Sequence, residues 1–201
     1  MISTSFFQRD PLTCSRELIG CELVWGDCAG IVVETEAYLA VGDEACHTFA
    51  RKSAREFIET HEAGSAYIYL NYGVHWLLNA LIKGGEEEGF ILIRAVEPTR
   101  GIELMQKRRH QVALRELGAG PGKLTQAMNV LGSDHGISLC ADPKRCFLFK
   151  PPLGEVIADT RIGISKAAHH PWRFLLKGSE FVSRKASWEA KKRPDWLPNP
   201  A

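Results

Sequence analysis

The stretch that most constrains the fold is residues 31–47, which read IVVETEAYLAVGDEACH. Its first three residues are β-branched and favour a strand in a pleated, half-buried sheet. Glu34 and Glu36 are two residues apart, so both carboxylates point to one face of that strand, and Tyr38 continues the face. An acidic turn and His47 follow. Paired acids also occur on solvated strand faces, but a carboxylate, a phenol and an imidazole near one apolar strand indicate a functional site.

The length and composition indicate a globular protein of one domain. A chain of 201 residues can bury a sizeable core, so we expect a single domain over residues 1–201. The net charge is only +1, whereas nucleic-acid-binding domains often carry a strong basic excess. Any DNA contact must therefore use a local basic patch. Residues 184–201 form a basic tail, which is either a loosely ordered arm or a solvated chain end.

The six cysteines are not spaced as metal ligands. No two of them form a CxxC pair, so a zinc site is not expected, and we favour no metal over a cluster built on Cys46 and His47. The sequence shows no secretion signal and no apolar run of membrane length. We therefore expect reduced thiols, no membrane partner, and a cytoplasmic (nucleoid-associated) or nuclear location.

Local patterns predict a chain of many strands and a few helices. Asp10 is a good N-cap and Pro11 suits a first helical turn, so a short helix is expected to start there. A strand over residues 21–25 is expected to pair with residues 31–36 as a hairpin and to hold Glu36 in place. The remaining predictions are strands at 66–70, 76–82, 90–96, 137–140, 146–150, 155–162, 173–176 and 180–182, and helices at 99–109 and 121–130.

Two further residues stand out from their surroundings. Arg94 interrupts the apolar strand 90–96, and a buried arginine needs partners, which the region of Glu36 can supply. A purely structural ion pair is the alternative for Arg94. Tyr72 lies in the turn Asn71-Tyr72-Gly73, where burial in a core is less expected than for a tyrosine within a strand. An aromatic side chain at a turn tip is a candidate wedge for DNA.

A glycine-rich run precedes Leu124 and superficially resembles a phosphate-binding P-loop. The first glycine of that motif is replaced by Leu117, and Leu124 stands where Ser or Thr would bind magnesium, so the motif fails. The run is better interpreted as a turn that opens a helix. Its backbone N–H groups at Gly122, together with Lys123, are candidates for holding a DNA phosphate.

Five blocks of sequence, in order along nearly the whole chain, form a recognisable set of motifs. They are residues 34–38 with 43–47, 67–73 with Asn79, 91–98, 120–124, and 161–164 with 173–174 and 178–179. Together these blocks resemble the alkyladenine (3-methyladenine) DNA glycosylase family. The resemblance implies a mixed α/β (α+β) single domain, with a curved, mainly antiparallel sheet flanked by helices and a hairpin that intercalates into DNA.

The resemblance also implies a function in base excision repair. Family members flip an alkylated or deaminated purine out of duplex DNA and hydrolyse its N-glycosidic bond. The implied substrates are 3-methyladenine, 7-methylguanine, hypoxanthine and ethenoadenine, and the implied partner is double-stranded DNA containing such purines. An alkylated purine is already a good leaving group, so a positioned carboxylate and a water are enough. We therefore expect an enzyme without a cofactor. We also expect it to be a monomer.

For the reaction itself, the resemblance assigns roles to three residues. Glu36 is implied to activate the water, and Arg94 and the backbone carbonyl of Ile162 are implied to hold that water. The resemblance assigns no role to Glu34, which we expect to polarise its neighbourhood or to bond to backbone.

For the damaged base, the resemblance assigns the pocket and the wedge. Tyr38 and Tyr69 are implied to stack on the base, with His47 facing it from the other side. Asn79 is implied to discriminate against normal guanine by crowding its exocyclic amine. Tyr72 is implied to enter the duplex where the damaged nucleotide has left.

Two other classes of function stay open at this point. One is a catalytically silent nucleic-acid-binding module. The other is a sugar glycosidase using Glu34 and Glu36 as acid and base, although two carboxylates on one strand face cannot easily flank a sugar. Residues 51–64 read as a mixed loop or short helix in which Ser53-Ala54-Arg55-Glu56 replaces the Thr-Pro-Arg-Asn of many relatives. That difference leaves phosphate contact by this segment and the ranking of substrates open.

Overall fold

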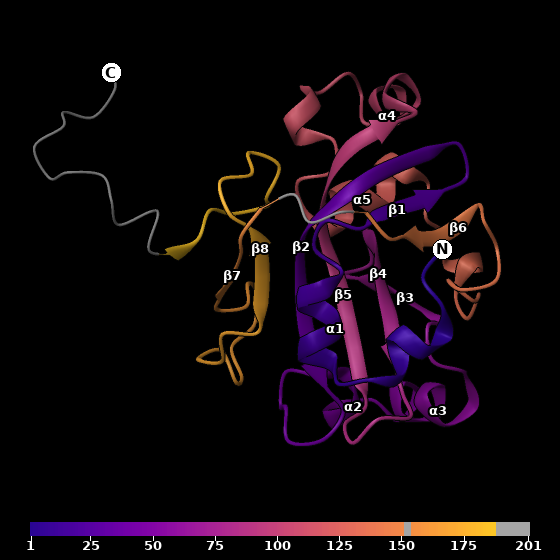
Figure 1. The fold of residues 1–201 in the computed structure, drawn as a ribbon, viewed down its shortest axis with the longest axis vertical. Helices are drawn as coiled ribbons and strands as arrows, with labels where there is room; N and C mark the ends of the chain where they lie inside the picture. The colour runs from indigo at the N-terminus through magenta and orange to yellow at the C-terminus, as the bar shows by residue number, and fades with distance from the viewer. Residues whose placement is uncertain (151–153, 188–201) are drawn as a thin grey trace, which may run out of the picture.

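The computed structural model describes residues 1–150 and 154–187. Its strands are β1 (Glu22–Trp25), β2 (Cys28–Leu39), β3 (Ala66–Asn71), β4 (His75–Ile82), β5 (Gly89–Arg100), β6 (Arg145–Leu148), β7 (Val156–Asp159) and β8 (Arg173–Leu176). They form one eight-stranded sheet in the order β3-β4-β5-β2-β1-β6, with β8 paired to β2 and β7 to β8. Every pairing is antiparallel, and the sheet is curled (Figure 1). The predicted fold class, a curved antiparallel sheet flanked by helices, is confirmed.

Within the described residues, five α-helices and three short 3-10 helices flank this sheet. They are α1 (Pro11–Glu17), α2 (His47–Ala50), α3 (Lys52–Thr60), α4 (Ile102–Arg108) and α5 (Pro121–Met128), with η1 (Thr4–Gln8), η2 (Leu114–Glu116) and η3 (Gly132–Asp134). The predicted cap of the first helix is confirmed, because Asp10 Oδ1 accepts a hydrogen bond of 2.8 Å from the backbone N–H of Thr13. Helix α1 packs on β2, and the segment containing α2 and α3 lies at the far end of the sheet from α4 (Figure 1).

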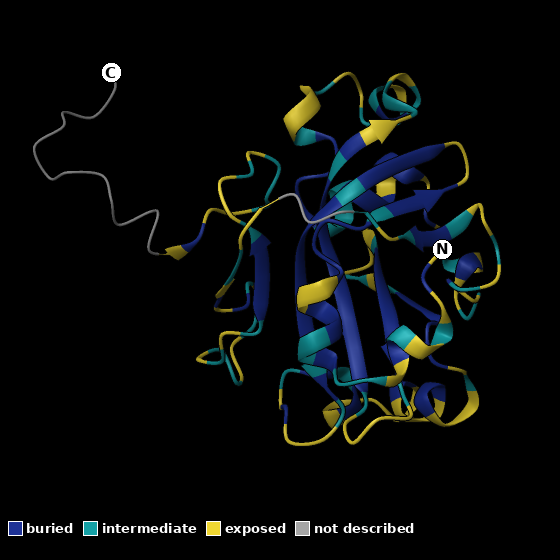
Figure 2. Cartoon of the chain, in the orientation of Figure 1, coloured by how far each residue is buried: buried dark blue, intermediate teal, exposed yellow. Residues whose placement is uncertain are grey.

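Strand β2 is the centre of the sheet, and its two halves have different neighbours. The first half pairs with β1 only as far as Ile31, opposite Glu22. The second half lies between β5 and β8, so Glu36 is opposite Leu92 on one side and Arg173 on the other. The expectation that the β1 hairpin holds Glu36 is therefore wrong. Two strands, both far away in sequence, hold this residue instead, and β2 and β5 are buried along most of their length (Figure 2).

Some predicted elements differ from the structure. The helix predicted over 99–109 starts later, because β5 continues to Arg100 and Gly101, at φ 72°, then turns the chain into α4. The strands predicted over 137–140 and 180–182 do not form. In the first, Ser138 makes only an isolated bridge to Ser65, and the second is a turn.

Two other segments are shorter or more regular than predicted. The strand predicted over 155–162 ends at Asp159, whose Oδ1 accepts a hydrogen bond of 2.7 Å from the next backbone N–H and turns the chain. The segment 51–64, predicted as a mixed loop or short helix, contains the nine-residue helix α3, which buries Ala54, Phe57 and Ile58.

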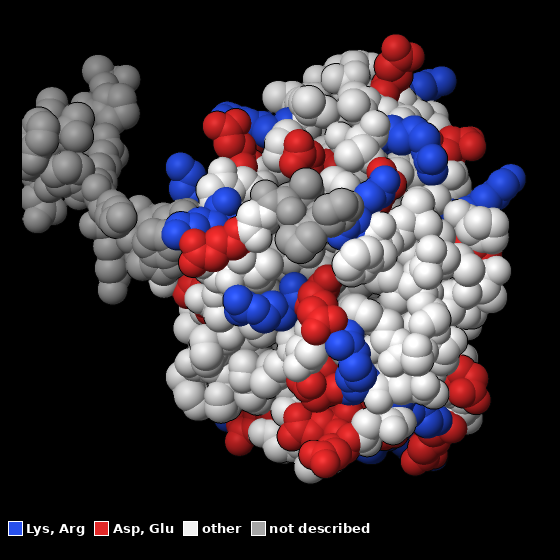
Figure 3. Space-filling model, viewed as in Figure 1, with Lys and Arg blue, Asp and Glu red and all other residues white. Residues whose placement is uncertain are grey.

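The surface agrees with the near-neutral charge of the chain. Basic and acidic side chains are interleaved over the face in Figure 3, with acidic ones gathering at its lower end. Of the basic tail predicted over 184–201, only residues 184–187 are described, and the rest lies outside the described residues. Among residues 1–150 and 154–187, no helix combines the length and the apolarity that crossing a membrane requires.

Candidate active site

The carboxylate of Glu36 is fully buried and held by three donors. Its Oε1 accepts the backbone N–H of Ile162 at 2.7 Å, and its Oε2 accepts the hydroxyl of Tyr38 at 2.7 Å and Nη1 of Arg94 at 3.3 Å. Burial raises the pKa of Glu36, while Arg94, the Ile162 N–H and the Tyr38 hydroxyl oppose this rise. Glu36 is therefore a stronger base than an exposed glutamate, yet has donors that stabilise its ionised form.

Glu34 points to the same side as Glu36, as the strand spacing predicted, because Arg94 contacts both carboxylates. Arg94 Nε donates to Glu34 Oε1 at 3.0 Å. The prediction that buried Arg94 finds its partners around Glu36 is confirmed. Glu34 also accepts the backbone N–H of Ser183 at 2.6 Å, so the expected bond to backbone is confirmed as well.

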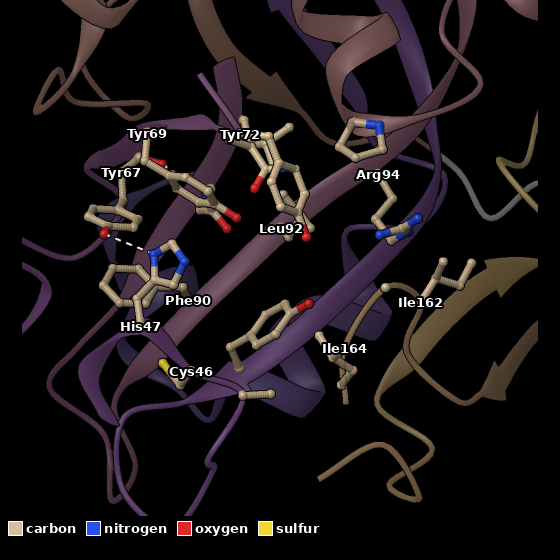
Figure 4. A pocket seen from close by; sticks show the side chains of 17 residues that line it. Cys46, His47, Tyr67, Tyr69, Tyr72, Phe90, Leu92, Arg94, Ile162 and Ile164 are labelled. Carbon is tan, nitrogen blue, oxygen red and sulfur yellow. Dashed lines mark hydrogen bonds between the residues drawn. The ribbon is translucent and has the colours of Figure 1, made fainter. Parts of the chain in front are cut away.

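A pocket of about 340 Å³ lies beside this charged group. Its volume lies within the range of about 300–1,000 Å³ common for small-molecule sites. Arg94 and Ile162 lie on one side of it, and His47 and Tyr67 lie on the opposite side (Figure 4). The three residues that donate to Glu36 all line the pocket, and so do the sequence-predicted residues Tyr38, His47, Tyr69, Tyr72, Asn79, Arg94 and Ile162. Glu36 itself lies directly behind its donors.

The far wall of the pocket is aromatic and carries no net charge. His47 lies edge-on to Tyr69, with 4.3 Å between ring centroids, and its Nδ1 lies 3.1 Å from the hydroxyl of Tyr67. Tyr67 in turn stacks on Phe90 at 4.5 Å. Burial, with help from Arg51, lowers the pKa of His47 to about 4, so its imidazole is neutral at physiological pH. Burial also raises the pKa of Tyr69 to about 12.

Tyr38 is supported from outside the pocket by a residue that the sequence-based analysis assigned no role. The guanidinium of Arg161 lies 4.6 Å from the Tyr38 ring centroid and 4.9 Å from that of Trp172. Arg161 also forms a bidentate ion pair with Asp43, with N–O distances of 2.6 and 2.8 Å. Arg161 therefore contacts both the turn that leads to His47, through Asp43, and the ring of Tyr38, so it supports both sides of the pocket.

Asn79 lies on strand β4 and is buried against the pocket. Its Nδ2 donates to the backbone carbonyl of Tyr67 across the hairpin at 3.0 Å. This bond fixes the orientation of the amide. Among the residues that the structure describes, no three His, Cys, Asp or Glu side chains are grouped so that they can hold a metal ion.

Tyr72 lies at the tip of the β3–β4 hairpin, at the rim of the pocket. Its side chain is 91% exposed, and its backbone is left-handed at φ 49°, followed by Gly73 at φ 70°. The predicted turn and the exposure of Tyr72 are confirmed. A tyrosine in the left-handed region is unfavourable, and such strain is found most often where a residue has a function.

The start of helix α5 lies close to the same hairpin. A Cβ atom at Gly122 would approach the ring of His75 to 2.8 Å, so the glycine lets the helix pack against β4. Lys123 Nζ is paired with Glu116 Oε2 at 2.6 Å, and this contact lowers the pKa of Glu116. The predicted phosphate contact at Gly122 and Lys123 stays a prediction, and Lys123 would have to leave Glu116, or share it, to make that contact.

A second layer of charged and polar residues had no role predicted from the sequence. They are Asp43, Arg161, Arg173 and Ser183, which hold the residues of the site from behind, and Asp159, which pairs with Arg173. Arg173 had a weaker form of the signal at Arg94, because it is a single charge at the start of an apolar strand. Ser183 had no such signal, because a serine near a chain end is ordinary.

Comparisons with known proteins agree with this site. The family model for methylpurine-DNA glycosylase matches residues 5–180. A protein of Agrobacterium fabrum is 44% identical over 92% of this chain and 93% of its own length, and one of Rhizobium meliloti is 43% identical over 90% and 95%. A protein of Methanoculleus marisnigri is 41% identical over 92% of this chain and 99% of its own length. All three bear the name "Putative 3-methyladenine DNA glycosylase". This chain therefore belongs to the methylpurine-DNA glycosylase family.

Proposed function

We propose that this protein is a monofunctional DNA glycosylase that removes damaged purines from double-stranded DNA. The substrates are purines of the 3-methyladenine, 7-methylguanine, hypoxanthine and ethenoadenine class. The single observation that carries this proposal is the position of Glu36. Its carboxylate is fully buried directly behind an aromatic pocket, and every group that donates to it lines that pocket.

For an alkylated purine that already carries a positive charge, the reaction needs one base and one water, whereas a neutral purine such as hypoxanthine must also take up a proton as it leaves. The water oxygen attacks C1′ of the flipped nucleotide while the bond from C1′ to the purine nitrogen breaks, and the bonding electrons leave with the base. Glu36 accepts a proton from the water. Arg94 and the backbone of Ile162 border the pocket beside Glu36, where the water is placed in this proposal.

The pocket holds the base by its flat faces. Tyr38 and Tyr69 supply rings for stacking, each worth about 1–3 kcal/mol on the scale known for nucleobases on aromatic side chains. His47 faces the base as a neutral imidazole, since its pKa is lowered to about 4 by burial. A neutral imidazole does not repel a purine that carries a positive charge after alkylation. Asn79 has its amide fixed to the hairpin backbone and acts as a steric filter for the purine edge.

The alternative functions make different demands. A sugar glycosidase that uses Glu34 and Glu36 needs both carboxylates open to the substrate. Glu34 accepts four hydrogen bonds, and of its donors only Arg94 lines the pocket, whereas Arg173 and Ser183 do not, so Glu34 is turned away from the substrate side. A catalytically silent DNA-binding module would retain the pocket and bind lesion DNA without releasing a base.

The deciding experiment is single-turnover release of base from duplex oligonucleotides. Each oligonucleotide carries one 3-methyladenine, 7-methylguanine, hypoxanthine or ethenoadenine, and an undamaged duplex is the control. Release from at least one lesion, lost in Glu36→Gln, supports the proposal and ranks the substrates. Binding of lesion DNA without release from any of the four would point to the silent module.

A further inference from the structure

Glu34 is saturated with hydrogen bonds and has no access to the pocket. Its Oε1 accepts Arg94 Nε, Arg173 Nη1 and Ser183 Oγ at 3.0, 3.0 and 2.9 Å, and its Oε2 accepts the Ser183 backbone N–H at 2.6 Å. A carboxylate used in this way has little capacity left for substrate. What it does instead is fix the position of its donors.

The donor that matters for the reaction is Arg94, because it touches both Glu34 and Glu36. Its Nε is on Glu34, its Nη1 is on Glu36, and its Nη2 donates to Ser183 Oγ at 3.3 Å. Two of the three nitrogens of the planar guanidinium are thus held by Glu34 and Ser183. The third nitrogen is thereby directed to Glu36.

From this geometry we propose that Glu34 and Ser183 are positioning residues for base release, and that they act by holding the guanidinium of Arg94 against Glu36. Ser183 lies after β8 in the segment before the described chain ends, so the C-terminal segment contributes to the active site. This inference rests on the proposed function, because it assigns the set of residues that prepares the proposed base.

The same segment contains a matched control. Ser187 binds Asp159 as Ser183 binds Glu34, with its backbone N–H at 2.7 Å and its Oγ at 2.9 Å from the carboxylate. Arg173 bridges the two carboxylates, at 3.0 Å from Glu34 and 2.7 Å from Asp159. Asp159 makes no described contact with Arg94. Ser187→Ala therefore measures what losing a serine–carboxylate hydrogen bond does to stability, without disturbing the position of Arg94.

Glu36 responds to the position of Arg94 in a way that can be measured. The groups facing Glu36 are Tyr38 and Glu34 on β2, Arg94 on β5, Tyr69 on β3, Arg173 opposite it on β8 and the Ile162 N–H after β7. Of these, Arg94 does most to oppose the rise in the pKa of Glu36 that burial causes. If Arg94 turns away, Glu36 takes up a proton at a higher pH, and the acidic limb of the rate profile moves to higher pH.

The experiment compares Ser183→Ala with Ser187→Ala, and uses Ser183→Thr as a rescue that keeps a hydroxyl. Both alanine variants lose one hydrogen bond to a buried carboxylate, which is expected to lower Tm by about 2–4 °C, and Ser183→Ala also loses the longer bond that its Oγ accepts from Arg94 Nη2. Only Ser183→Ala is expected to slow single-turnover base release, by about tenfold, and to shift the acidic limb of the pH–rate profile to higher pH. Glu34→Gln is expected to slow release by up to about a hundredfold, the effect of misplacing a catalytic group by about 1 Å.

A second readout does not depend on activity. Selectively ¹³C-labelled glutamate reports the proton uptake of Glu36 by NMR, with Glu36→Gln to assign its signal. The proposal expects uptake at a higher pH in Ser183→Ala, and an unchanged value in Ser187→Ala and Ser183→Thr. Equal behaviour of the two alanine variants in rate and in proton uptake would show that Glu34 and Ser183 are only structural. Failure of the wild-type protein to release any base would overturn the proposed function, while the NMR comparison would still decide the role of Ser183.

Discussion

The region around Glu36 lies behind the wall of the pocket and the turn at Tyr72 lies at its rim, and the two are built in opposite ways. Glu36 is fully buried, and each of its hydrogen bonds comes from a donor in the pocket wall. Tyr72 is 91% exposed, and no hydrogen bond of its side chain occurs in the described part of the chain. Glu36 has hydrogen-bond partners from three segments, β2, β5 and the chain after β7, whereas Tyr72 projects from a two-strand hairpin.

The contrast follows from the task that we propose for each region. A group that transfers a proton must be placed before the substrate arrives, because its geometry and pKa decide the rate. A group that enters DNA has its partners in the DNA, so in the free protein it must stay exposed. The left-handed backbone at Tyr72, φ 49°, holds its side chain outward at a local cost in conformational energy. Variants of the two regions therefore test whether base release and capture of the lesion are separable.

The largest effect is expected for Glu36→Gln. A neutral isostere keeps the shape of the site but cannot accept a proton, so base release should fall by at least about 10²–10⁴-fold. Binding to lesion duplexes should change little, because Glu36 lies behind the pocket wall. Single-turnover release and equilibrium binding on the same duplex measure the two quantities. An active Glu36→Gln protein, or a Glu34→Gln protein that is the less active of the two, would reverse the assignment.

The next effect is expected for Tyr72→Ala, and it should concern capture more than chemistry. Loss of a stacking ring worth about 1.4–3 kcal/mol corresponds to about ten- to a hundredfold weaker binding of a lesion duplex. A lesion in single-stranded DNA leaves no gap to fill, so binding and cleavage there should be nearly unchanged. Tyr72→Phe, which keeps the ring, is the control. Equal losses on single and double strands would make Tyr72 a pocket residue.

A smaller effect is expected when the pH is lowered: below the pKa of Glu36, the rate of base release should fall about tenfold per pH unit. Glu36 must be ionised to accept a proton, and burial raises its pKa above the ordinary value of 4.5. The rate should therefore fall as the pH drops through a value above 4.5. His47, with a pKa of about 4, should stay neutral above pH 5 and add no limb there. Single-turnover rates on a hypoxanthine duplex and an NMR titration of His47 measure both. A plateau that persists below pH 4.5 would contradict the role of Glu36.

The smallest expected effect is none at all, and it concerns the nucleophile. With water as the nucleophile, activity should survive a strong chelator, and borohydride should trap no covalent protein–DNA adduct. No lysine lines the described pocket, which is consistent with a reaction without an amine nucleophile. A trapped adduct would reassign the nucleophile to an amine and would move the chemistry away from Glu36.

The sequence predicted elements best where local rules decide them. The cap at Asp10, the strands on both sides of Tyr72 and the start of the helix at Pro121 follow from side chains within a few residues. Prediction failed where pairing over long distances decides. β1 is a good hairpin partner by proximity, yet the part of β2 that carries Glu36 pairs with β5 and β8 instead.

The sequence by itself determined the strand with its two carboxylates, the tyrosines near the site, the exposed turn and, through its motifs, the family. Only the tertiary structure shows which contacts make the two carboxylates differ. Glu34 and Glu36 have the same side chain and the same strand face, and their difference arises from β5, β8 and the C-terminal segment. These bring four hydrogen bonds to Glu34 and place the donors of Glu36 in the pocket wall. Burial and hydrogen bonding set the chemistry of a carboxylate, and both come from residues that lie far away in the chain.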